Sequence, residues 1–222
     1  MPGRSLPLVR GEIYHIFNRG IDHRPTFIGK RDYTRALETI KFYRFASPPV
    51  RLAVYLSVGV DRRDEIQRNL SSAEKLIDLF AYCLMPNHFH FLIKPLSDQG
   101  VATFLSQFQN SYTRYFNTKD KRTGPLFLDQ FKAVRIETDE QLMHVQRYIH
   151  LNPYTSFVVK KLEDIFTYPW SSLKEYFEAG EGLCEKTSVL SHFKDLVNYK
   201  QFIVDQASYQ RELASIKHLL ME

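Results

Sequence analysis

The sequence of 222 residues has few cysteines and no long hydrophobic run. Its two cysteines, Cys83 and Cys184, are too few for a disulfide framework or a zinc site built from cysteine. No hydrophobic stretch approaches the ~18 to 20 residues that cross a bilayer, and none is typical of a signal peptide. Repeats and low-complexity tracts are absent as well. We therefore expect a reducing, cytoplasmic setting and no membrane partner.

The composition is that of a globular protein. Hydrophobic residues make up 44% of the chain and charged residues 25%, which excludes disordered and fibrous classes. The length is enough for one domain with a substantial core, or one domain with appendages.

Positive charge is concentrated at the start of the chain. Residues 1–51 contain 10 basic and 4 acidic side chains, whereas residues 52–222 contain 20 basic and 21 acidic side chains. A basic segment on a folded domain favours contact with phosphates, and hence with nucleic acid. A mildly basic protein without such a partner is the alternative.

Hydrophobic periodicity predicts a mixture of strands and helices. Strands are expected over 11–18, 79–85, 87–94 and 131–136, and helices over 30–45, 101–117, 138–151, 170–177 and the tail 188–222. The turn at Met85-Pro86-Asn87 implies antiparallel pairing of the strands around it. Thr138 and Gln141 form a capping box, and Pro153 is expected to end that helix. We predict an α+β fold, with an antiparallel sheet flanked by helices.

The segment His88-Phe89-His90 places two imidazoles on one face of a strand. Alternate residues of a strand share a face, so Phe89 points the other way, into the core. Two histidines at this spacing are a ready pair of metal ligands. The alternative is a pair of histidines on a solvated or hydrogen-bonded sheet face.

A second group of polar side chains lies on the capped helix. His144, Tyr148 and Asn152 are spaced i, i+4, i+8 and therefore share nearly one face. The amide oxygen of Asn152 can complete a metal site, and a cation and a base can activate a tyrosine hydroxyl one turn away. Packing of the helix on the sheet is the alternative explanation.

Four segments together resemble the REP-associated tyrosine transposases, which are single-tyrosine HUH transposases. The segments are YHIFNRG, AYCLMPNHFHFLIKP, RTGPLFLDQFKAVRI and RYIHLNPYTSF, in the order of the family. The resemblance spans roughly 9–177. Residues 50–72 read as a variable insertion, and no match is found after Gly180.

The resemblance implies a fold, a domain organisation and roles for individual residues. The HUH fold has a ferredoxin-like or RRM-like core, expected here over 1–178, with a helical extension over 179–222. His88 and His90 match the metal ligands, Tyr148 the nucleophile and Asn152 the third ligand. His144 is a candidate base, and packing is its alternative role. Tyr112 and Tyr115, in a preceding helix, are rival nucleophiles that we interpret as packing or DNA-contact residues.

The resemblance also implies a reaction and its partners. The family uses Mg²⁺ or Mn²⁺ to cut single-stranded DNA beside a hairpin through a 5′-phosphotyrosine, followed by strand transfer, which suggests a location at the nucleoid. The resemblance is compatible with either a homodimer or a monomer. A domesticated hairpin-binding protein that does not cut, or a metallo-hydrolase that uses water, are the alternatives. Candidate DNA contacts are Arg19, Arg24, Lys30, Arg31, Lys119, Lys121, Arg122 and Lys132.

Overall fold

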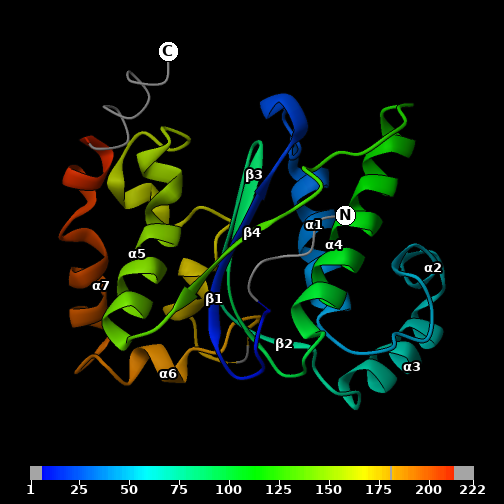
Figure 1. The fold of residues 1–222 in the computed structure, drawn as a ribbon, viewed down its shortest axis with the longest axis horizontal. Helices are drawn as coiled ribbons and strands as arrows, with labels where there is room; N and C mark the ends of the chain where they lie inside the picture. The colour runs from blue at the N-terminus through cyan, green and yellow to red at the C-terminus, as the bar shows by residue number, and fades with distance from the viewer. Residues whose placement is uncertain (1–6, 181, 213–222) are drawn as a thin grey trace.

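A four-stranded antiparallel sheet forms the centre of the molecule (Figure 1). The computed structural model describes residues 7–180 and 182–212. The strands are β1 (Ile13–Arg19), β2 (Ile77–Met85), β3 (His88–Pro95) and β4 (Lys132–Ile136), in the order β2-β3-β1-β4. Each neighbouring pair is antiparallel, which confirms the predicted α+β class.

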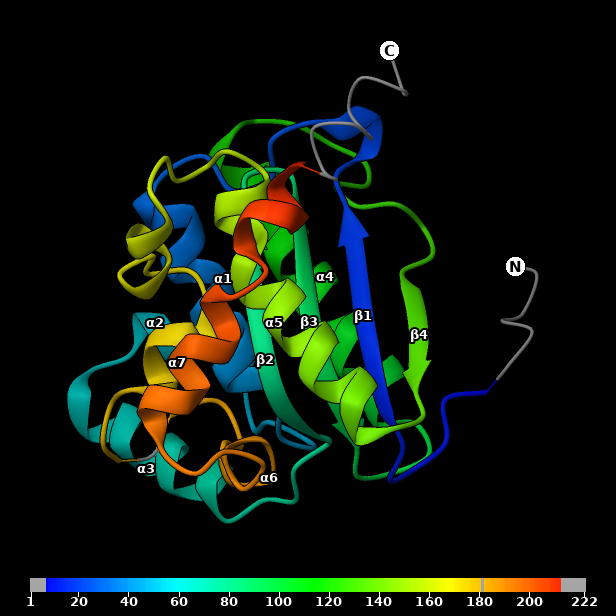
Figure 2. The same cartoon turned by 90° about the vertical axis from the view of Figure 1, so that its left-hand side faces the viewer.

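Helices cover both faces of this sheet (Figures 1 and 2). On one face lie α1 (Lys30–Tyr43) and α4 (Gly100–Lys119), with α2 (Leu52–Ser57) and α3 (Val60–Ser71) beyond them. On the other face lies α5 (Asp139–Thr155), with α6 (Thr187–Leu190) and α7 (Leu196–Val204). Short 3-10 turns span Ile21–His23, Leu162–Phe166 and Ser172–Tyr176.

The alternation in β3 separates a hydrophobic face from a polar one, as predicted. Phe89 and Phe91 are fully buried, and their rings lie 5.2 and 5.4 Å from that of Phe108 on α4. Burying aromatic rings between sheet and helix stabilises this layer by ~1.5 to 3 kcal/mol for each ring. His88 and His90 consequently face the opposite side, toward α5.

The segment expected to be a variable insertion forms α2 and α3. Within α3 hydrophobic residues are few, but Ile66 and Leu70 are 2% and 1% exposed, and they anchor this helix on the core. Arg63 donates to the carbonyls of Leu56 and Val58, which ties the two helices together. Periodicity alone could not place these helices, because α2 is a short apolar run that could be strand or helix and α3 is mostly charged.

Helix α5 begins as predicted but ends later. The Thr138 hydroxyl accepts a hydrogen bond from the Gln141 amide at 3.2 Å, which caps the first turn. The expectation that Pro153 ends the helix near residue 151 was wrong, because the helix continues to Thr155. Proline removes its own amide hydrogen and crowds the carbonyl four residues earlier, but the last turn still forms, since the Ser156 amide bonds to the carbonyl of Asn152 at 2.9 Å.

The chain after α5 covers the edge of β2 and then packs on α5. The amide of Leu84 donates to the carbonyl of Trp170, and that of Glu185 donates to Leu79. The helix expected over 170–177 is a 3-10 turn at Ser172–Tyr176. The predicted helical tail is confirmed in α6 and α7, whereas residues 213–222 of that prediction lie outside the described residues.

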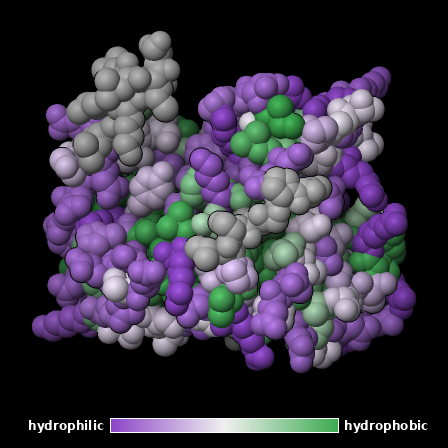
Figure 3. Space-filling model, in the orientation of Figure 1, coloured by the Kyte–Doolittle hydropathy of each residue, from purple (hydrophilic) through white to green (hydrophobic). Residues whose placement is uncertain are grey.

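The surface is largely polar on the side shown in Figure 3, where hydrophobic side chains gather in small groups between hydrophilic ones. Within the described ranges, no helix has the length and hydrophobicity that a membrane crossing requires.

Candidate active site

The central strands bring three histidines together beneath α5. His90 on β3 pairs with Phe17 of β1, and His15 lies two residues earlier on the same face of β1. His88 and His90 are neighbours on β3, with ring centroids 5.0 Å apart. The pairing register of β1 and β3 therefore adds His15 to the histidine pair predicted from the sequence.

The ring of His90 is held by His15. The Nδ1 atom of His90 lies 2.9 Å from Nε2 of His15, and the rings are stacked with centroids 5.1 Å apart. Burial holds the pKa of His90 well below its ordinary value and lowers that of His15 to about 4. Both rings are neutral near pH 7, and the tautomer in which Nδ1 of His90 donates to His15 leaves Nε2 of His90 with a free electron pair.

The ring of His88 is fixed from two sides. Its Nδ1 atom lies 2.7 Å from the side-chain oxygen of Asn87. Burial lowers the pKa of His88 to about 4, the hydrogen bond with the Asn152 side chain opposes this shift, and nearby His23 adds to it. The side chain of Asn152 thus lies beside the His88 ring, and its amide nitrogen also donates to the carbonyl of Tyr148 at 3.4 Å.

Tyr148 stands over this polar face at the surface of the molecule. Its ring is 5.6 Å from that of His90 and 5.9 Å from that of His15, in both cases edge to face. The side chain is 42% exposed, whereas Asn152, one turn later on α5, is 3% exposed. The helix thus places one accessible hydroxyl and one buried amide next to the histidines of the same chain.

The donor set fits a divalent metal ion. Two neutral imidazoles and an amide oxygen are suitable for Mn²⁺ and Mg²⁺, although the nitrogen ligands favour the softer ion. In the part of the chain that the structure describes, no group of three or more His, Cys, Asp or Glu side chains is placed to hold a metal. A metal at His88 and His90 would need a further ligand of another type, and the Asn152 amide is the candidate that the sequence predicted.

His144 is engaged with neighbours other than Tyr148. Its Nδ1 atom lies 2.6 Å from a guanidinium nitrogen of Arg147, and its Nε2 atom lies 3.7 Å from a carboxylate oxygen of Glu140. Its ring also lies 6.2 Å from that of Phe202 on α7. The side chain is 48% exposed, so it is not part of the core, and these contacts join it to Arg147 and Glu140 rather than to Tyr148.

The two rival tyrosines lie on the other face of the sheet. Tyr112 is fully buried, and its hydroxyl donates to the carbonyl of Thr26 at 2.6 Å. The hydroxyl of Tyr115 donates to the Asp32 carboxylate at 2.9 Å. Neither hydroxyl shares a face with the histidines.

The predicted DNA contacts fall into three groups. Arg19 and Lys132 lie on the histidine face, opposite His88 and Phe17 in the strand register, and Arg24 lies in the loop after β1. Lys30, Arg31 and Lys119 lie between α1 and α4. Lys121 and Arg122 follow α4, where Arg122 donates to the carbonyl of Pro125. The sequence could not separate these groups, because it does not show on which side of the sheet each basic residue lies. That position depends on how the helices and loops pack.

The loop after β1 packs against the turn that precedes His88. Gly20 donates to the carbonyl of Asn87 at 2.8 Å, and the side chain of Asn87 donates to the carbonyl of His23 at 3.3 Å. A Cβ atom at Gly20 would lie 2.5 Å from the carbonyl oxygen of Arg24, so this approach requires glycine. Arg19 contacts the ring of His23 in the same loop. The loop thereby places cationic side chains at the rim of the histidine site.

His15 is the functional candidate that sequence reasoning missed. Alternation along the strand expected over 11–18 puts His15 on one face with Phe17. The sequence does not show that this face of β1 lies beside the histidine face of β3. That depends on the register between two strands that are far apart in the chain.

Comparison with known proteins agrees with the resemblance found in the sequence. Residues 60–152 match the model of the family described as "Transposase IS200 like", a range that contains His88, His90, Tyr148 and Asn152 but not His15. No curated protein matches the chain. A solved structure of a REP-associated tyrosine transposase bound to a REP hairpin is similar, with a TM-score of 0.56 at 12% identity, over 85% of this chain and 96% of that one. The resemblance found in the sequence is thereby confirmed over residues 60–152, and the fold of the chain is similar to that of a REP-associated tyrosine transposase.

Proposed function

We propose that this protein cuts and rejoins single-stranded DNA beside a hairpin, with Tyr148 as the nucleophile. The observation that supports this best is the position of the Tyr148 ring, 42% exposed and within 6 Å of two buried, neutral histidines. An exposed tyrosine over a polar, hydrogen-bonded sheet face is poorly explained by packing, because packing would bury the ring.

The chemical step conserves the energy of the phosphodiester. The Tyr148 oxygen forms a bond to phosphorus, the bond from phosphorus to the 3′ oxygen breaks, and the tyrosine proton is replaced by the phosphoryl group. The products are a DNA 3′-OH, which takes up a proton, and a 5′-phosphotyrosine on the protein. Attack by another 3′-OH reverses the step and transfers the strand.

We propose His88, His90 and Asn152 as the ligands of a Mg²⁺ or Mn²⁺ ion. Such an ion, when bound, would polarise the scissile phosphate and offset its charge. The chain's own contribution is to hold these groups in place: His15 holds the His90 ring, and Asn87 holds that of His88. Arg19 and Lys132, on the same face, are placed to attract the phosphates on either side.

A single-stranded substrate suits this geometry. The exposed Tyr148 side chain projects from α5 at the rim of the histidine face, and a flexible strand presents one phosphate to it more readily than a stacked duplex does. The similar solved structure contains a transposase bound to a REP hairpin, and this supports a hairpin partner for the present chain. One chain carries all four proposed groups, so a monomer has a complete site.

The experiment is to trap the covalent adduct. The protein is incubated with Mn²⁺ and a pool of labelled oligonucleotides that share one stem-loop and carry randomised single-stranded flanks. We expect a protein–DNA species that survives denaturation, and sequencing of the bound strands identifies the flank. A stable complex with the stem-loop and no adduct would instead identify a hairpin-binding protein that does not cut. Cleavage without an adduct would identify a hydrolase that uses water.

Replacing His15 should weaken metal binding without unfolding the protein. In His15→Ala the Nδ1 atom of His90 loses its partner, and loss of such an outer contact typically costs about 10- to 100-fold in metal affinity. Mn²⁺ titration followed by electron paramagnetic resonance measures this directly. His15→Gln, which restores a hydrogen-bond acceptor, should recover part of the affinity. Unchanged Mn²⁺ affinity in His15→Ala would exclude the positioning role.

Replacing His144 distinguishes a base from a packing residue. A general base typically contributes 10²- to 10⁴-fold, and its loss shrinks as pH rises toward the pKa of a tyrosine hydroxyl, about 10. Because Arg147 and Glu140 engage both ring nitrogens, we expect His144→Ala to slow cleavage by less than about 100-fold, equally at all pH values. A pH profile of the cleavage rate decides between the two roles.

A further inference from the structure

Helix α5, which carries Tyr148, is held along one side by helix α7. The two helices lie alongside each other in both views of the fold, and α5 lies between α7 and the sheet in Figure 1 (Figures 1 and 2). Helix α7 lies outside the range 60–152 that matches the family model. The support of α5 therefore comes partly from outside the segment that this chain shares with that family.

Arg147, the residue before Tyr148, binds the C-terminal end of α7. Its side chain is 3% exposed, and its two terminal nitrogens donate to the carbonyl of Phe202 at 3.2 Å and to the side-chain oxygen of Gln206 at 3.1 Å. The guanidinium also lies 4.2 Å from the centre of the Phe202 ring. A cation at this place matches the negative end of the dipole of α7 and the carbonyls of its last turn.

A second set of contacts anchors α5 through buried polar side chains. Gln146 donates to the hydroxyl of Tyr199 on α7 at 2.8 Å, and that hydroxyl lies 3.3 Å from Nδ1 of His150. Nε2 of His150 lies 2.9 Å from the hydroxyl of Ser172, which in turn accepts from the amide of Tyr82 on β2 at 2.9 Å. This network joins α5 to α7 and to the sheet, and a buried hydrogen-bonded network of this kind is rigid.

These anchored residues lie on both sides of Tyr148 in the chain. Gln146 and Arg147 come directly before it, and His150 follows two residues later. The Tyr148 side chain itself is 42% exposed, and in the described ranges its hydroxyl has no hydrogen-bond partner. The backbone of α5 therefore sets the direction of this hydroxyl. A displacement of about 1 Å at a reacting group can cost on the order of 100-fold in rate.

The choice of arginine at 147 indicates more than packing. A hydrophobic side chain of similar volume would fill the space between α5 and α7 without the cost of burying a charge. The guanidinium instead adds donors in a fixed, planar arrangement, which hold α5 against rotation and sliding relative to α7. One of its nitrogens also lies 2.6 Å from Nδ1 of His144, one turn before Tyr148, so the same group fixes two turns of the helix.

We propose that Arg147 is a positioning residue for the cleavage reaction, and that it acts through the C-terminal end of α7. By fixing the rotation of α5, it sets the direction in which the Tyr148 hydroxyl meets the scissile phosphate. This inference rests on the proposed function for the role of Tyr148. It assigns Arg147 an effect on the rate of cleavage and none on the affinity for DNA or metal.

The first test separates rate from affinity. Arg147→Met keeps an unbranched side chain against Phe202 and removes the donors, and Arg68→Met, at an exposed arginine on α3, is the matched control. Cleavage in a single turnover, at saturating Mn²⁺ and stem-loop DNA, should slow by about 10- to 100-fold in Arg147→Met, with both affinities within about twofold of the wild type. The control should behave as the wild type. Arg147→Lys, which keeps the charge but not the planar donor group, should be intermediate. An unchanged rate, or a fall in DNA or Mn²⁺ affinity as large as that in rate, would overturn the positioning role.

A milder variant decides the matter if Arg147→Met lowers the thermal midpoint. Gln206 is exposed and supplies one of the acceptors for Arg147. Gln206→Ala removes this acceptor without opening the core, and it should slow cleavage by a smaller factor, with both affinities again retained. A rate equal to that of the wild type in Gln206→Ala would then exclude the role.

The second test needs no cleavage. The Tyr148 ring lies edge to face with the rings of His15 and His90, at 5.9 and 5.6 Å, so its ring current shifts their proton signals. In metal-free protein with labelled histidine, nuclear magnetic resonance should show these signals moved in Arg147→Met in the direction seen in Tyr148→Leu. Slower cleavage with unmoved signals would overturn the inference. Moved signals together with no adduct from the wild type would retain Arg147 as the residue that orients Tyr148 and overturn Tyr148 as the nucleophile.

Discussion

Tyr148→Phe should abolish both DNA cleavage and the covalent adduct while leaving the protein folded. The substitution removes the attacking oxygen and almost no volume. The side chain is 42% exposed, and in the described ranges its hydroxyl has no hydrogen-bond partner, so the change in stability should stay within about 0.5 kcal/mol. Stem-loop affinity should be retained, because phosphate contacts supply most of it. Denaturing gels measure cleavage and adduct formation, and fluorescence anisotropy of a labelled stem-loop measures DNA affinity, on the same protein preparation.

Peptide mapping locates the adduct in the wild type. Trypsin cuts after Arg147 and Lys160, and the peptide between them contains Tyr154 as well as Tyr148. Tyr154→Phe is therefore the control that shares the peptide, and Tyr112→Phe and Tyr115→Phe are controls on the other face of the sheet. All three should keep adduct formation. An adduct on any of these residues, or cleavage in Tyr148→Phe, would refute the assignment.

His88→Ala and His90→Ala should each abolish cleavage and Mn²⁺ binding. Each substitution removes one of only two imidazole ligands of the proposed site, and the amide of Asn152 alone does not hold a divalent ion firmly. Stem-loop binding in the absence of metal should be largely retained. Cleavage assays, Mn²⁺ titration and anisotropy separate the three properties.

Asn152→Ala should have a smaller effect than either histidine change. The amide is the weakest of the three proposed ligands, so excess Mn²⁺ should partly restore cleavage. His192→Ala, at an exposed histidine outside the site, is the control and should behave as the wild type. Cleavage that persists in the presence of a chelator would show that the reaction needs no metal.

Some histidine changes also remove buried contacts, so folding has to be checked alongside activity. His90 is 5% exposed and bonded to His15, and truncating it leaves a buried polar group unpaired, at a cost of about 1 to 3 kcal/mol. A folded His90→Ala protein that binds DNA but neither binds Mn²⁺ nor cleaves is the informative outcome. His90→Gln, which keeps more of the volume, serves if His90→Ala is unstable.

Local patterns determined the elements that carry the candidate site. Alternation in β3 is visible in the sequence because phenylalanine and histidine differ so strongly in the cost of burial, and it correctly assigned the two faces. The cap at Thr138 and the spacing of Tyr148 and Asn152 are equally local, since hydrogen bonds and helical geometry within a few residues define them. The end of α5 was misjudged, because one missing amide hydrogen at Pro153 matters less than the burial of that turn.

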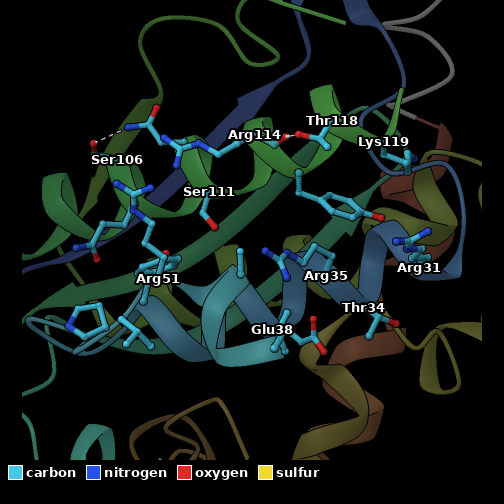
Figure 4. A pocket seen from close by; sticks show the side chains of 18 of the residues that line it. Arg31, Thr34, Arg35, Glu38, Arg51, Ser106, Ser111, Arg114, Thr118 and Lys119 are labelled. Atoms are coloured by element: carbon cyan, nitrogen blue, oxygen red, sulfur yellow. Dashed lines mark hydrogen bonds between the residues drawn. The ribbon is translucent and has the colours of Figure 1, made fainter. Parts of the chain in front are cut away.

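Contacts between distant parts of the chain were decided only by the tertiary structure. His15 and His90 are 75 residues apart, and their hydrogen bond exists because β1 pairs with β3 in one register, which no local pattern encodes. The same holds for the hollow lined by α1, α4 and residues 47–56, whose cationic side chains come from three separate segments of the chain (Figure 4). The sequence by itself determined which residues could do chemistry and on which face of each element they lie. The packing of helices on the two sides of the sheet decided which of these residues meet, because burial of the hydrophobic faces is what selects the arrangement.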